Sequence, residues 1–194
     1  MENFEQTYPP EKIERPPFLY HASPNRNIKK FKPRAKNIRN QEEGPVVFAT
    51  PDLALATAFL VSGTNDSWTQ IGKINGVSYI AISDKEYFTK CDKGGSIYKF
   101  SSDSFTCHSD KGMGENEWVS NDPVVPIEKT DVNSALEAMI DNGVQVYFID
   151  KKDFNELVRA ETDKEIVEIF KKIQSENQKR RRNVFQFDSE HKKL

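Results

Sequence analysis

The chain has few cysteines and no long apolar run, whereas many small secreted proteins are rich in cysteine and membrane proteins contain long apolar runs. Only two of its 194 residues are cysteine, Cys91 and Cys107, which argues against a disulfide framework and for a reducing compartment. No apolar run approaches the roughly 18 residues needed to cross a bilayer, and the acidic, polar start is unlike a secretory signal. We therefore expect a soluble cytoplasmic protein, although delivery by a specialised secretion system would leave the same features.

The sequence also lacks a strong charge bias. Its formal net charge is −2, which argues against nucleic-acid binding over the whole surface. The apolar fraction of 36% is low, but 13 Phe, six Tyr and two Trp supply bulky core material. The length suits one globular domain with appendages.

The order of the expected elements indicates an α+β fold. Apolar segments predict strands at 46–49, 77–82, 97–100, 117–120 and 144–149, with loops at 63–76 and 101–114. Thr50 and Pro51 are expected to be the N-cap and first residue of a helix that runs to Leu60. Strands dominate the middle of the chain and helices its end, so the pattern is not an alternating βαβ one.

Three further helices are expected toward the C-terminus. One begins at Asp131 and ends at Gly143, and two begin with capping boxes, Asp153 with Glu156 and Thr162 with Glu165. The predicted organisation is an extended arm at 1–16, a main domain at 17–152, C-terminal helices at 153–178 and a charged tail at 179–194.

Three short segments carry the candidate chemistry. They are Tyr20-His21-Ala22-Ser23, the strand-to-helix unit from Val47-Phe48-Ala49-Thr50 to Phe59, and Gly112 to Trp118 with Glu115 and Glu117. In this order they resemble the ADP-ribosyltransferases, in particular the His-Tyr-Glu branch that includes diphtheria-type toxins and poly(ADP-ribose) polymerases. The resemblance covers about residues 17–150. It implies a split β-sandwich of mainly antiparallel strands with peripheral helices, and transfer of ADP-ribose from NAD to an unknown acceptor with release of nicotinamide.

The resemblance also implies roles for the first two segments. His21 would hold a ribose hydroxyl and the backbone after it, at Ala22, the nicotinamide amide; Ser23 and Thr50 would complete the NAD-binding set. Phe48 and Phe59 match two aromatic positions, the first a tyrosine in the family, although Val47 is an alternative for that position. Phenylalanine keeps the stacking face and loses the hydroxyl. The alternative interpretation makes these aromatic residues ordinary core, and His21 a packed histidine.

The third segment would supply the catalytic carboxylate. Cleavage of the nicotinamide–ribose bond passes through an oxocarbenium-like centre, which a carboxylate stabilises. Glu117 matches the catalytic glutamate of the family, and Glu115 the position that engages the acceptor in arginine-directed members. On an extended segment both carboxylates would share one side, with Asn116 opposite. The alternative interpretation is a solvated acidic turn.

Two basic stretches could contact anions. Residues 26–39 hold seven basic residues and no acidic one, and we nominate Arg34 to bind the NAD pyrophosphate. Together with Lys179–Arg182 this stretch could instead contact nucleic acid or a partner, or be merely solvated.

Other sites find little support in the sequence. Cys91, Cys107, His108 and His21 lack the paired spacing of a zinc site, and no Walker or Rossmann glycine loop is present. Two rival functions stay open: an inactive nucleotide-binding module and an NAD-dependent RNA 2′-phosphotransferase-like enzyme. The oligomeric state is not indicated.

Overall fold

The computed structural model describes residues 13–38, 44–61 and 68–190, and these form an α+β fold. Ten strands, five α-helices and two short 3-10 turns lie within the described residues, and every strand pairing but one is antiparallel. The α+β class expected from the sequence is therefore confirmed. Residues 1–12 of the expected arm, Arg39 of the basic stretch and the last four residues of the tail lie outside the described part.

Strands and helices follow one another along the described residues, and two helices come last. The strands are β1 (Phe18–Ser23), β2 (Arg34–Ile38), β3 (Pro45–Ala49), β4 (Thr69–Ile74), β5 (Val77–Ile82), β6 (Gly95–Ser101), β7 (Thr106–Cys107), β8 (Trp118–Ser120), β9 (Glu128–Val132) and β10 (Gln145–Phe148). The helices are α1 (Leu53–Ala58), α2 (Lys85–Cys91), α3 (Ala135–Asp141), α4 (Lys151–Val158) and α5 (Asp163–Glu190), and the 3-10 turns are η1 (Ser102–Ser104) and η2 (Gly114–Asn116).

The strands make three sheets, with the orders β1-β6-β9, β10-β5-β4 and β2-β3-β8-β7. One backbone bridge joins β1 to the end of β3, where Tyr20 and Thr50 exchange hydrogen bonds of 2.7 and 2.9 Å. β1 pairs with β6 along its whole length, and β3 pairs with β2 and β8. The bridge between β1 and β3 therefore does not extend into a longer ladder.

The start of α1 differs from the expectation. Asp52, not Thr50, is the N-cap, and its Oδ1 accepts from the Leu55 N–H at 3.1 Å. Thr50 cannot begin the helix because both of its backbone groups bond to Tyr20 across the bridge. Its hydroxyl oxygen accepts from the Asp52 N–H at 3.2 Å and so supports the turn into the helix.

Other boundaries were also wrong. Residues 69–74, expected as loop, form β4 through an antiparallel hairpin with β5. Asp131 lies on β9 because that segment pairs with β6, and the helix begins after Ser134. The first C-terminal helix is capped by Asp150 and not by Asp153.

The second capping box is confirmed. The Glu165 carboxylate accepts from the Thr162 N–H, and the Thr162 hydroxyl accepts from the Glu165 N–H. The helix that follows, α5, continues to Glu190, past residue 179, where the charged tail was expected to begin.

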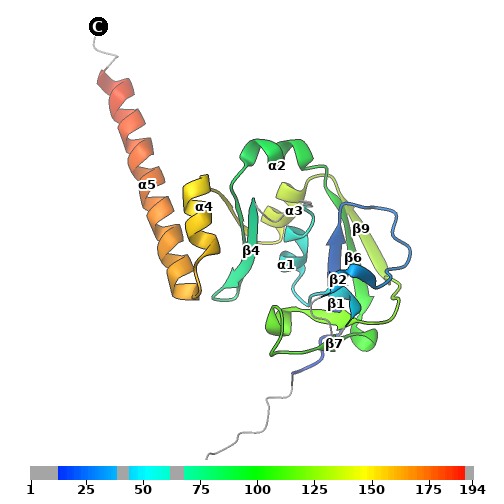
Figure 1. Cartoon of the computed structure of the whole chain (residues 1–194). Helices are drawn as coiled ribbons and strands as arrows, with labels where there is room; N and C mark the ends of the chain where they lie inside the picture. The colour runs from blue at the N-terminus through cyan, green and yellow to red at the C-terminus, as the bar shows by residue number, and fades with distance from the viewer. Residues whose placement is uncertain (1–12, 39–43, 62–67, 191–194) are drawn as a thin grey trace, which may run out of the picture.

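The buried apolar side chains form separate clusters rather than one core. Leu19, Tyr98, Phe100 and Trp118 belong to one cluster between the first and third sheets, whereas α4 and α5 cover Tyr79 and Ala81 of β5. Figure 1 shows α4 and α5 on the opposite side of the molecule from β1, β6 and β9, with α1 and α3 between them. Among the described helices, none combines the length and the apolar character that a membrane crossing requires.

Tyr98 provides a test of how the core supports the turn after β1. Its side chain is fully buried, and its hydroxyl donates to the Asn25 carbonyl at 2.6 Å and accepts from the Ile28 N–H at 3.3 Å. Replacing Tyr98 by Phe leaves two backbone groups without this partner, so we expect the free energy of unfolding to fall by about 1–3 kcal/mol. Urea denaturation measures it; Tyr87→Phe, at an exposed site, is the control. Equal stability of both variants would contradict the anchoring role.

Candidate functional site

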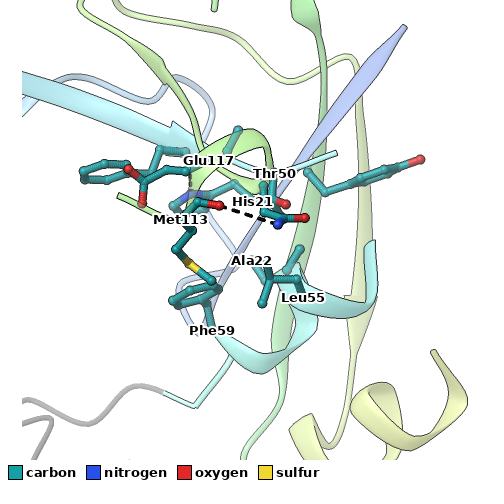
Figure 2. A pocket seen from close by; sticks show the side chains of 12 residues that line it. His21, Ala22, Thr50, Leu55, Phe59, Met113 and Glu117 are labelled. Carbon is teal, nitrogen blue, oxygen red and sulfur yellow. Dashed lines mark hydrogen bonds between the residues drawn. The ribbon is translucent and has the colours of Figure 1, made fainter. Parts of the chain in front are cut away.

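A cavity of about 300 Å³ opens where β1 and β3 separate. β1 contributes Tyr20, His21 and Ala22, and β3 with its extension contributes Phe48, Ala49 and Thr50. The remaining wall comes from α1 and from the turn before β8, through Leu55, Ala56, Phe59, Met113, Asn116 and Glu117. Figure 2 shows Phe59 and Met113 on one side of this cavity and Ala22 and Leu55 on the other. Side chains from all three sequence segments thus border one space.

His21 is held by the neighbouring strand. Its Nδ1 lies 2.7 Å from the Phe48 carbonyl oxygen, drawn as the dashed line in Figure 2. Its ring also meets the Phe31 ring edge-on, with 4.8 Å between the centroids. A carbonyl only accepts, so Nδ1 carries the hydrogen. These two contacts set both the orientation and the tautomer of the imidazole.

The surroundings of His21 favour its neutral form. Burial lowers the pKa of the imidazole, and the positive charge of Arg34 lowers it further, against the opposing effect of the bond to Phe48. In the neutral ring with a hydrogen on Nδ1, the other nitrogen, Nε2, is a hydrogen-bond acceptor. His21 can therefore accept a hydrogen bond from a hydroxyl group of a ligand.

The two candidate aromatic residues both reach the cavity. Phe48 borders it from β3, whereas the alternative residue, Val47, is only 3% exposed and packs in the core cluster of Leu19 and Trp118. Phe59 caps the end of α1, and its side chain is 45% exposed. An aromatic side chain this exposed at a cavity mouth offers a face on which a planar ring can stack.

Glu117 lies at the end of the turn that leads into β8. Its backbone N–H bonds to the Gly114 carbonyl at 3.0 Å, and its side chain borders the cavity. The carboxylate packs on the backbone of Gly112, which has a φ of +56°; a Cβ there would come 2.8 Å from the carboxyl carbon. Only glycine accommodates both this φ and this contact without strain. The loop therefore shapes the position of the carboxylate.

The expected alternation of Glu115, Asn116 and Glu117 was wrong. Residues 114–116 form the 3-10 turn η2, so successive side chains do not alternate as on a strand. Glu115 is exposed and does not line the cavity, whereas Asn116 lines it beside Glu117. Sequence reasoning missed Asn116, Met113, Leu55 and Ala56 as cavity residues. The available signal in the sequence was the pair Gly112 and Gly114, because glycines favour a turn. In the structure both have a positive φ.

A second, smaller cavity of about 80 Å³ adjoins the first, because His21 and Phe48 border both. Its other walls include Ser23, Lys32 and Arg34. The predicted cofactor residues Ser23 and Arg34 therefore lie here rather than in the larger cavity. Two cationic side chains and a hydroxyl make this cavity suitable for an anionic group.

A polar bridge that the sequence did not indicate connects α1, β4 and the Glu117 turn. The Lys73 ammonium donates to Asp52 Oδ2 at 2.6 Å and to Asn116 Oδ1 at 3.2 Å, and the Ser78 hydroxyl donates to the same Asp52 oxygen. Burial opposes ionisation of Asp52, but bonds from Lys73, the Leu55 N–H and Ser78 outweigh it and hold its pKa below the usual range.

The described residues contain no group of three or more His, Cys, Asp or Glu side chains arranged to hold a metal ion. Comparisons with known proteins add no assignment: no protein-family model, curated protein or solved structure matches the chain. The function must therefore be argued from the site itself.

The lowered pKa of the partly buried His21 predicts a pH dependence of stability. Its pKa is lower in the folded state than the roughly 6.5 of an unfolded chain, so the unfolded state binds more protons below that value. We expect the free energy of unfolding to fall as the pH is lowered from 7.5 to 5.5. In His21→Asn, whose amide N–H can still donate to Phe48, the fall should be smaller.

Urea denaturation at several pH values between 7.5 and 5.5 measures this slope. His108→Asn, at an exposed site, is the matched control and should keep the wild-type slope. An unchanged slope in His21→Asn would show that another group governs the pH dependence.

Proposed function

We propose that the chain is an NAD-dependent ADP-ribosyltransferase that transfers ADP-ribose to an acceptor with release of nicotinamide. The observation that carries this proposal is the convergence of His21, Phe48 and Glu117 on one cavity, from three segments that are far apart in the sequence. Their order resembles that of the His-Tyr-Glu transferases, and the mainly antiparallel sheets are compatible with the split β-sandwich of that family.

The chemistry of the two cavities supports NAD as the substrate. Neutral His21 can accept from a ribose hydroxyl through Nε2, and Phe48 and Phe59 offer faces for the nicotinamide ring. Arg34 and Lys32 in the adjoining cavity can neutralise a phosphate. The nicotinamide–ribose bond would then lie near Glu117, whose carboxylate can stabilise positive charge as that bond breaks.

A second candidate is an inactive binding module that keeps the same cavity. The specific observation in its favour is Phe48, which lacks the hydroxyl that the family carries at this position, together with Glu115, which is exposed and does not line the cavity. Calorimetry with NAD beside a nicotinamide-release assay separates the two functions. Binding without turnover in the wild-type protein would select the module.

Glu117 gives the sharpest test of catalysis. Glu117→Gln preserves the shape of the side chain and removes its charge, so we expect nicotinamide release from NAD to fall at least about a hundredfold. The exposed Glu115→Gln should release nicotinamide at close to the wild-type rate. Melting temperatures of both variants check the fold. Full activity in a folded Glu117→Gln protein would refute a catalytic role for this residue.

Gly112 offers a test that leaves every charged group in place. A Cβ at Gly112 would displace the Glu117 carboxylate, whereas a Cβ at Gly76, also in the left-handed region with a φ of +80°, meets no atom within 4 Å. Alanine at either position costs about 1–2 kcal/mol of backbone strain. We therefore expect similar melting temperatures for Gly112→Ala and Gly76→Ala but slower nicotinamide release only in Gly112→Ala. Equal rates would contradict the dependence of catalysis on this contact.

A further inference from the structure

Lys73 reaches the candidate site from an element that belongs to none of the three sequence segments. It lies on β4, directly opposite Ser78 of β5 in the antiparallel register. This cross-strand pair directs two donors at the same oxygen, Asp52 Oδ2, at 2.6 and 3.1 Å. Asp52 is in turn fixed as the N-cap of α1.

The Lys73 ammonium is restrained and partly shielded from water. Its side chain is 26% exposed and that of Asp52 is 19% exposed, so screening by solvent is weaker than for a surface pair. The remaining bond goes to Asn116 Oδ1 at 3.2 Å. Because an ammonium only donates, this bond also fixes which atom of the Asn116 amide faces Lys73.

Several hydrogen bonds within the turn that carries Glu117 join residues that are close in the sequence. The Gly114 N–H bonds to Lys111, the Glu117 N–H bonds to Gly114, and the Trp118 indole N–H bonds to the Glu115 carbonyl. The bond from Lys73 differs, because it joins residues 43 positions apart and connects the turn to the helix on the other wall of the cavity. Such a long-range bond restrains the whole turn relative to the start of α1.

We propose that Lys73, held by Asp52, is a positioning residue that fixes Asn116 and the turn carrying Glu117 against α1. The cavity then keeps its width and the carboxylate keeps its place without contact between Lys73 and the ligand. The restraint of the turn stands on the geometry alone, whereas its effect on turnover rests on the proposed ADP-ribosyltransferase function.

The test compares Lys73→Met, Lys73→Arg and Lys99→Met in the full-length protein. Lys99 is the matched control, because it is also 26% exposed and pairs with a carboxylate, Glu128, at 3.3 Å, away from the turn. Hydrogen exchange of the amides from 111 to 118 is measured first. We expect exchange about tenfold faster in Lys73→Met, close to wild type in Lys99→Met, and largely restored in Lys73→Arg, which keeps a cationic donor.

Turnover of NAD provides the second measurement. A positioning residue affects the bond-breaking step, so kcat for nicotinamide release should fall at least about fivefold in Lys73→Met while KM changes less than about twofold. Lys73→Arg should recover most of kcat. A raised KM with unchanged kcat would identify Lys73 as a ligand contact and overturn the proposal.

A further variant, at Asp52, distinguishes loss of the Lys73 contacts from loss of folding and from failure of the proposed function. Asp52→Asn can still cap α1 but loses the charge that holds Lys73, so it should reproduce the faster exchange of Lys73→Met at little cost in melting temperature. Wild-type exchange rates in both variants would overturn the proposal. If exchange responds as expected but the wild-type protein releases no nicotinamide, the positioning role stands and the proposed function fails.

Discussion

The backbone bridge between Tyr20 and Thr50 is the contact on which the candidate site depends. Two hydrogen bonds join β1 to the end of β3 at one residue pair, whereas β1 pairs with β6 along its whole length and β3 pairs with β2 and β8. A longer ladder between β1 and β3 would close the space that the cavity occupies. With one bridge, His21 Nδ1 lies 2.7 Å from the Phe48 carbonyl oxygen, and there is still room for a cavity of about 300 Å³.

Hydrogen bonds fix the orientation of two polar side chains around this cavity, His21 and Asn116. The Phe48 carbonyl determines the tautomer of His21, and burial together with Arg34 lowers its pKa and so favours the neutral ring. On the opposite wall, Lys73 can only donate, so it orients the amide of Asn116 through its oxygen. Both walls therefore present side chains whose orientation is set before any ligand arrives, which lowers the cost of binding and of catalysis.

The position of the Glu117 carboxylate depends on the backbone conformation of the turn before β8. Gly112 adopts a φ of +56° and leaves room for the Glu117 carboxylate, and η2 turns Glu115 out to solvent. The two carboxylates are therefore placed differently: Glu117 borders the cavity, and Glu115 is exposed outside it. Asn116 and Met113 are the cavity residues nearest to Glu117 in the sequence.

Much of the site could be predicted from local patterns, whereas its boundaries and supporting contacts could not. The strands around Phe48 and Val77 follow from runs of β-branched and aromatic residues. The capping box of Thr162 and Glu165 follows from four consecutive positions. Both signals depend on neighbours in the sequence. The N-cap of α1 was misplaced because a partner far away, Tyr20, holds Thr50 in an extended conformation. Likewise β4 exists because β5 pairs with it, and Asp131 lies on a strand because β6 is adjacent. By itself the sequence determined the α+β class and the three segments that meet at the cavity. Only the structure decided that Asn116 rather than Glu115 lines the cavity beside Glu117, because residues 114–116 form a 3-10 turn instead of an extended segment. Only the tertiary structure decided that Lys73 bonds to Asn116, because this contact joins residues 43 positions apart, a separation that carries no periodic signal.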